Sequence, residues 1–150
     1  MPRQLTEQER QAFLAEPRVA VVSVAGDDGR PPLVTPTWYA YEPGGNITFF
    51  TGTQGRKARK KRLIAQAGVL TLSVQHGEFP YKYVTVEGTV VATDQPPSAE
   101  QMLTVACRYL PEDDAQGFVQ GELARPRAEL ILYTVRPDRW LTADFSDDAG

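Results

Sequence analysis

Residues 49–62 of the chain read FFTGTQGRKARKKR. A short apolar strand over residues 49–51 runs into a turn of small and polar residues, and a basic helix is predicted from Arg56 to about Gln66. The first amides of a helix have no partner within the helix, and the helix dipole adds partial positive charge there. A phosphate at this end would meet free N–H groups and the cations of Arg56 and Lys57. The pattern predicts a phosphate anchor for a bound cofactor.

The same basic run has two other interpretations. Lysines and arginines on a short helix are typical of a solvated face, and they can also bind nucleic acid. The chain carries a net charge of −3, which argues against nucleic acid, because nucleic-acid-binding domains usually carry clear excess positive charge. Gly52 and Gly55 allow the backbone to approach an anion closely, and this favours the cofactor site over the solvated face.

Length and composition set broad limits on the class of protein. We expect one domain over residues 1–150, with a mobile acidic tail at 144–150. A single cysteine, Cys107, excludes an internal disulfide, and one histidine, His76, leaves no sensible zinc site, so no metal is expected. We find no signal sequence and no apolar run approaching the roughly 18 residues of a membrane span. The expectation is a soluble, cytoplasmic protein that contacts neither membrane nor nucleic acid.

The secondary-structure signals alternate between short strands and capped helices. Capping boxes at Thr6 and Ser98 predict helices that end before Pro17 and near Tyr109, and a third helix reaches Leu123 from a cap at Asp113 or Asp114. Six strands are predicted over residues 19–24, 32–41, 47–51, 69–74, 83–93 and 129–135, the last of them stopped by Pro137. With two hairpin turns, this pattern favours a mainly antiparallel barrel whose open parts are covered by helices.

The common catalytic motifs are absent. There is no Gly-x-Ser-x-Gly elbow, no Gly-x-Gly-x-x-Gly turn opening a βαβ unit and no Walker A sequence. With His76 as the only histidine, a Ser-His-Asp arrangement is not credible. If the protein is an enzyme, its chemistry should come from a cofactor that the chain binds and orients.

Three segments carry a resemblance to a known family. Residues 49–51 (FFT), 55–58 (GRKA) and 83–88 (YVTVEG), in this order and spacing, resemble the pyridoxamine-phosphate-oxidase-like split β-barrel flavoproteins. The chain is most similar to the deazaflavin-dependent (coenzyme F420) oxidoreductase branch, over roughly residues 9–140. The resemblance implies a mainly β fold with helices, a six-stranded antiparallel split β-barrel, and a homodimer with two cofactors at the interface.

The resemblance also implies which residues hold the cofactor. Arg56 and Lys57 would bind its phosphate, with support from Thr51 and the amides beside Gly55. Its ring would lie along the second strand of the hairpin, against Thr35, Pro36, Thr37 and Trp38.

Further contacts would come from the other subunit of the dimer. Lys82, Tyr83 and Trp140 could reach a cofactor held mainly by that subunit, although Trp38 and Trp140 are equally explained as packing residues. Tyr81 and Tyr83 are the candidate proton donors. After Trp140 there is no arginine and histidine set of the kind that the oxidase itself uses, which argues against pyridoxamine-phosphate oxidation.

Coenzyme F420 and FMN share a tricyclic ring and a phosphate, so Arg56 and Lys57 suit either. The deazaflavin adds an oligoglutamate tail, and Lys60 and Lys61, together with the arginines around them, exceed what one phosphate needs. This surplus favours F420 as the cofactor, with FMN as the alternative. The predicted function is transfer of hydride from reduced F420 to an electron-poor small-molecule acceptor such as a quinone. The alternatives are an FMN-dependent pyridoxamine-phosphate-oxidase-like flavoprotein and a cofactor-binding protein without turnover.

Overall fold

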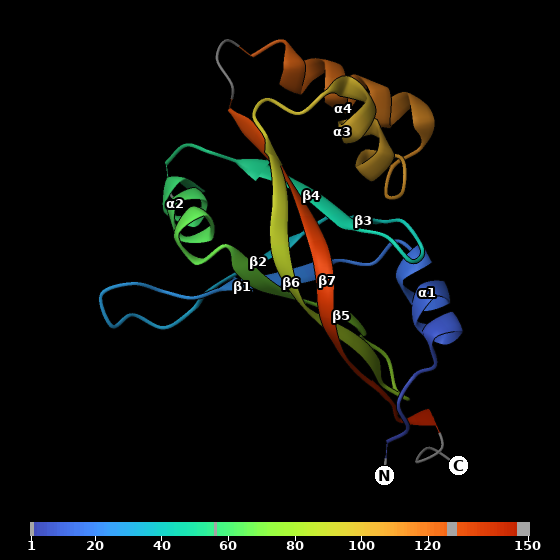
Figure 1. Ribbon diagram of the computed structural model, residues 1–150. Coiled ribbons are helices and arrows are strands. Elements are labelled where there is room, and N and C mark those ends of the chain that lie inside the picture. Colours follow the sequence, from blue (N-terminus) through green and yellow to red (C-terminus); the bar gives the residue numbers. More distant parts are fainter. Residues whose placement is uncertain (1, 56, 126–128, 147–150) are drawn as a thin grey trace.

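An antiparallel sheet forms the centre of the computed structural model, which describes residues 2–55, 57–125 and 129–146 (Figure 1). Its seven strands are β1 (Ala20–Val24), β2 (Leu33–Thr37), β3 (Ala40–Tyr41), β4 (Ile47–Gly52), β5 (Val69–His76), β6 (Lys82–Asp94) and β7 (Leu130–Asp144). The helices in the described residues are α1 (Glu7–Ala15), α2 (Lys57–Ala67), α3 (Ala99–Ala106) and α4 (Glu112–Leu123).

The strand order is β2-β1-β5-β6-β7-β4-β3. Only Trp38 and Tyr39 separate β2 from β3, yet these strands lie at the two edges of the sheet. The sheet must therefore curl until its edges approach each other, and β2 contacts β4 across the opening. The result is the expected split barrel, an antiparallel sheet that is curled but not closed.

The strand predicted over residues 32–41 is two strands in the structure, so the predicted count of six is wrong. The break falls at Tyr39, whose side chain is buried and donates a hydrogen bond to the carbonyl of Leu14 (3.0 Å). The amide of Tyr39 donates to the hydroxyl of Tyr109 (3.1 Å). Because that amide is used by a distant tyrosine, it is not available to a strand ladder, and the chain passes from one sheet edge to the other here.

The last strand does not stop at Pro137, contrary to the prediction. β7 continues to Asp144, and Pro137 pairs with Gly88 at a register shift in the β6–β7 ladder. Proline lacks an N–H donor and is tolerated in strands at such irregularities. A Cβ on Gly88 would lie 2.8 Å from the carbonyl oxygen of Arg136, so this close approach of the two strands requires glycine.

Two helices begin where the capping boxes predict. Thr6 and Glu9 exchange hydrogen bonds at the start of α1, and Ser98 and Gln101 do the same at α3. Each box satisfies backbone donors that a helix end leaves without partners. Both predicted helix starts are confirmed.

The helix α4 begins two or three residues earlier than expected. Pro111 occupies the N-cap position and makes no side-chain capping bond, so neither Asp113 nor Asp114 is the cap. Figure 1 shows α3 and α4 side by side at one end of the sheet. Their contact is a small apolar cluster separate from the barrel core, formed by Met102, Ala106, Ala115 and Val119. None of the helices in the described residues is long and apolar enough to cross a membrane.

Candidate cofactor-binding site

A cavity of about 500 Å³ lies where β2, the end of β4, the start of α2 and the helix α4 meet. Most of the residues predicted to bind the phosphate and the ring come together here, although they belong to two separate segments of the chain. The predicted residues that line the cavity are Thr35, Pro36, Thr37, Thr51, Lys57 and Lys60.

Two glycines shape the turn between β4 and α2. Gly55 has a φ of +64°, in the left-handed region that glycine adopts without strain. At Gly52 a Cβ would lie 2.8 Å from Cδ of Lys57, so the missing side chain leaves room for Lys57 beside the strand end. The turn is tied to the start of β7, because the amide of Thr53 donates to the carbonyl of Glu129 (2.9 Å).

The amides at the start of α2 are already used. The N–H of Lys57 donates to the carbonyl of Gln54 (3.2 Å), and the N–H of Ala58 donates to that of Gly55 (3.1 Å). Gly55 itself does not line the cavity. Among the described residues, the positive charge at this site therefore comes from side chains rather than from the two helix amides beside Gly55. Arg56, predicted as a phosphate ligand, lies outside the described residues.

Lys60 is the most unusual side chain of the cavity. It is only 7% exposed, and its Nζ donates a hydrogen bond to Oγ1 of Thr51 (2.8 Å). No carboxylate within the described residues pairs with it. Burial, and secondly the charge of Lys57, lower the pKa of Lys60 below its ordinary value. A buried cation without a counter-charge is costly, so the geometry calls for an anion at this point of the cavity.

An apolar surface adjoins the two lysines. Phe50 of β4 and Phe118 of α4 line the cavity, with ring centroids 6.1 Å apart. Trp38 does not line it: its ring stacks on Tyr109 (4.9 Å, 6° between planes) and lies 6.0 Å from Phe118. For Trp38 the packing interpretation therefore holds in this structure. A planar ring entering the cavity would meet Phe50 and Phe118 beside the strand β2.

The helix α4 brings charged residues that the sequence interpretation missed. Glu122 follows Phe118 by about one turn of α4, Arg125 lies two residues beyond the end of α4, and Glu129 immediately precedes β7. Arg125 forms ion pairs with Glu122 (3.5 Å) and Glu129 (3.2 Å). The spacing of Phe118 and Glu122 is a usable signal that they share a face of α4, but nothing local indicates that this face borders the cavity.

The surplus cations of α2 have a structural partner. Arg59 (3.3 Å) and Arg62 both form ion pairs with Asp27, in the turn between β1 and β2. The hydrogen bond from Arg62 is the largest cause of the lowered pKa of Asp27. These contacts hold the β1–β2 hairpin against α2. Lys61 is partly exposed and does not line the cavity.

The residues predicted to act across a dimer lie away from this cavity. Lys82 forms a long ion pair with Asp144 (3.9 Å), and Tyr81 and Tyr83 are exposed. Trp140 lies under the guanidinium of Arg10, 4.2 Å from the ring centroid. Within one protomer the structure does not bring these side chains to Lys57 and Lys60.

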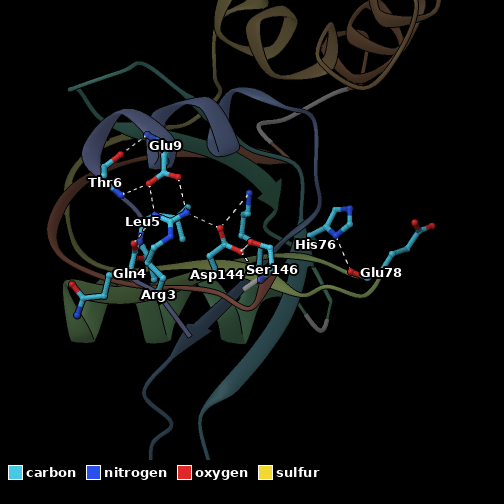
Figure 2. Close-up of polar contacts among 11 residues, drawn as sticks. Arg3, Gln4, Leu5, Thr6, Glu9, His76, Glu78, Asp144 and Ser146 are labelled. Atoms are coloured by element: carbon cyan, nitrogen blue, oxygen red, sulfur yellow. Dashed lines mark hydrogen bonds and ion pairs between the residues drawn. The ribbon is translucent and has the colours of Figure 1, made fainter. Parts of the chain in front are cut away.

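A separate polar cluster joins the two ends of the chain (Figure 2). Asp144 is only 3% exposed and accepts hydrogen bonds from Nη2 of Arg3 (2.9 Å) and from Oγ of Ser146 (2.6 Å). Arg3 also pairs with Glu9 (2.8 Å). The hydrogen bonds from Ser146 lower the pKa of Asp144. Of the predicted mobile tail at 144–150, Asp144 is the last residue of β7 and Ser146 is hydrogen-bonded to it, whereas residues 147–150 lie outside the described part of the chain.

No group of histidine, cysteine, aspartate or glutamate side chains in the described residues could hold a metal ion. None of the curated proteins matches the chain. A family model does: residues 6–142 match that of the pyridoxamine 5'-phosphate oxidases.

Solved structures share the fold. A protein described as an F420 reductase is 25% identical, with a TM-score of 0.61, and the match covers 87% of this chain and 94% of that one. A conserved hypothetical protein from Mycobacterium tuberculosis is 18% identical with a TM-score of 0.75, over 97% of this chain and 89% of that one. An FAD-binding protein from Mesorhizobium loti is 18% identical with a TM-score of 0.61, over 96% of both chains.

Proposed function

The chain belongs to the pyridoxamine 5'-phosphate oxidase family, and on that premise we propose that it is an F420-dependent oxidoreductase, which transfers hydride from reduced deazaflavin to an electron-poor organic acceptor. The choice of deazaflavin is supported by the likeness to an F420 reductase at 25% identity. The observation that carries the proposal is Lys60, a buried cation that faces a cavity and has no anionic partner in the described residues.

The cavity suits a ligand with one phosphate and a planar ring. Charge-assisted hydrogen bonds contribute about 1.5–3 kcal/mol each, so Lys57 and Lys60 together would contribute about 3–6 kcal/mol. Micromolar binding needs about 8 kcal/mol. The difference would come from packing of the ring against Phe50 and Phe118, because burial of apolar area stabilises a complex at about 25 cal/mol per Å².

Bound deazaflavin would supply the hydride chemistry. The chain's own residues then have a binding and orienting role: Lys57 and Lys60 hold the phosphate, and Thr35, Pro36 and Thr37 border the ring. No acid or base within the cavity is required by this assignment, since the proton that follows a hydride can come from solvent.

The proposal includes a homodimer. On the outer face of the sheet, one row of paired residues crosses four strands from Val21 through Ser73 and Thr85 to Leu141. The row carries no charge, and Val21 and Leu141 are exposed (36% and 42%). A second copy covering this face would bury them, and neighbouring Tyr83 would then lie at the interface as a contact for the other copy's cofactor. Val21→Asp should dissociate the dimer in sedimentation measurements; an unchanged mass would contradict this interface.

FMN is the second candidate, and one observation favours it. Arg59 and Arg62 are both paired with Asp27, so two of the four cations that would guide an oligoglutamate tail already have an ion-pair partner within the chain. An FMN-dependent flavoprotein of the same family needs only the single phosphate contact at Lys57 and Lys60.

The test measures oxidation of reduced F420 by the protein and includes a matched control variant. Purified protein is mixed with reduced F420 and a panel of quinones, enones and tetrapyrroles, and cofactor oxidation is followed by absorbance. Steady oxidation that is lost in Lys60→Met and retained in Lys61→Met supports the proposal. Tight binding without turnover of any acceptor would instead indicate a cofactor-binding protein, and FMN retained on purification would indicate the flavin alternative.

A further inference from the structure

The cavity is charged differently on its two sides. The α2 side presents the cations of Lys57 and Lys60, whereas the α4 side presents Glu122, Arg125 and Glu129. Arg125 is bound between the two glutamates, so these three described residues together carry one net negative charge. Figure 1 shows the two helices at different places around the end of β4.

The acidic side is held in place rather than free in solvent. The side chains of Glu122 and Glu129 are 16% and 30% exposed, against 55% for Arg125. The backbone of Glu129 is fixed by hydrogen bonds from Thr53, from its amide (2.9 Å) and from its hydroxyl (3.3 Å). Charges withdrawn from water are screened less, so the two carboxylates act on a ligand inside the cavity.

We propose that Glu122, Arg125 and Glu129 form a charge filter, which admits a ligand with a single anionic group at Lys57 and Lys60 and disfavours a second phosphate or a run of carboxylates on the α4 side. The inference rests on the proposed function, because it assigns the ligand class of the same cavity. It implies that an oligoglutamate tail must leave the cavity past α2, away from Glu122 and Glu129. Like charges placed close together are a common means of rejecting a wrong ligand.

The experiment compares ligands that share a ring and a first phosphate and differ in further charge. The pairs are FMN with FAD, and deazaflavin phosphate without and with its glutamate tail. For each pair, the ratio of dissociation constants is measured in wild type, in Glu122→Gln/Glu129→Gln and in Arg125→Gln. The matched control is Asp113→Asn/Asp114→Asn, which removes the same charge from the first turn of α4, away from the cavity lining.

The charge filter predicts that the ratio of dissociation constants changes in opposite directions in Glu122→Gln/Glu129→Gln and in Arg125→Gln. Glu122→Gln/Glu129→Gln should improve binding of FAD relative to FMN by at least about threefold, and Arg125→Gln should weaken it. The ratio for the deazaflavin pair should change less, because its tail leaves past α2. Both effects should shrink at high salt, and the control should leave the ratio unchanged. Binding with ratios that do not respond to either variant would overturn the filter and leave the proposed function standing. Binding of no ligand in wild type would overturn both.

Discussion

The ammonium nitrogen of Lys60 lies 2.8 Å from the hydroxyl oxygen of Thr51 and lines the cavity at the end of β4. An ammonium has three donors, and within the described residues Thr51 is its one hydrogen-bond acceptor. The remaining donors have no acceptor among the described residues, although Lys60 lines the cavity. The pair explains why a basic helix follows β4 in this chain: it delivers a cation from α2 to an anion bound beside the strand.

Lys60→Met should remove one of the two side-chain contacts to the phosphate. We expect FMN or F420 affinity to fall about ten- to a hundredfold, the equivalent of about 1.5–3 kcal/mol for one charge-assisted hydrogen bond. Thermal stability should be retained or should rise, since the substitution removes a buried charge. The matched control is Lys61→Met, which does not touch the cavity, and riboflavin, which lacks the phosphate, should bind both variants equally. Equal FMN affinity in the two variants would refute the assignment of Lys60.

The affinity for a phosphate-bearing ligand should depend on pH through Lys60. Burial and the charge of Lys57 lower the pKa of Lys60 from its ordinary value of 10.5. The charged lysine binds the anion, so affinity should be full below the folded pKa and should decline as the pH rises through it. Calorimetric titrations across the alkaline range would show this decline in wild type, and Lys60→Met should lack it.

The ligand-free protein should respond to pH in the opposite direction. Between the lowered folded pKa of Lys60 and 10.5, the unfolded state binds more protons than the folded state. The contribution of Lys60 to the free energy of unfolding should therefore increase with pH in this window. Urea unfolding of wild type and Lys60→Met isolates that contribution, and a difference that does not vary with pH would contradict it.

Gly52→Ala tests the position of Lys57. The new Cβ would meet Cδ of Lys57 at 2.8 Å, and because a lysine side chain is flexible, we expect Lys57 to move and the fold to persist. Cofactor affinity should fall several-fold without a loss of thermal stability beyond about 1 kcal/mol. Gly77→Ala is the control, because nothing lies within 4 Å of the added carbon. Unchanged affinity would show that cofactor binding does not depend on the present position of Lys57.

Asp144→Asn tests the cluster that joins the chain ends. Hydrogen bonds from Ser146 lower the pKa of Asp144 below its ordinary value of 3.8. The contribution of Asp144 to the free energy of unfolding is therefore present above pH 3.8 and is lost as the pH falls through the folded pKa. The variant should lose about 1–3 kcal/mol of stability at neutral pH, since Arg3 and Ser146 lose a charged acceptor. The deficit should narrow in acid, as measured by urea unfolding. A deficit of equal size in acid would contradict this role.

Most of the barrel could be predicted because its signals are local. The apolar alternation along β6 and the capping boxes at Thr6 and Ser98 depend on residues a few positions apart. The break at Tyr39 could not be predicted, since its cause is the hydroxyl of Tyr109, seventy positions away. The continuation of β7 past Pro137 likewise depends on the pairing with Gly88.

The candidate site likewise contains residues that the local sequence could predict and residues that it could not. The strand, turn and helix that deliver Thr51 and Lys57 form one continuous segment, so the pattern indicated both residues as cavity residues. Whether Lys60 or Lys61 turns inward depends on the packing of α2, and only the structure separates the buried lysine from the partly exposed one. Glu122 reaches the cavity through tertiary packing of α4, which leaves no mark in the local sequence.

The most direct test of the central claim is a side-by-side calorimetric titration of the purified, cofactor-free protein with F420 and with FMN. We predict saturable binding of both ligands through their shared phosphate at Lys57 and Lys60, with F420 bound more tightly. FMN bound more tightly would contradict the choice of deazaflavin and leave the phosphate site intact. Binding of neither would contradict the account at its centre, and the basic helix would then be a solvated face.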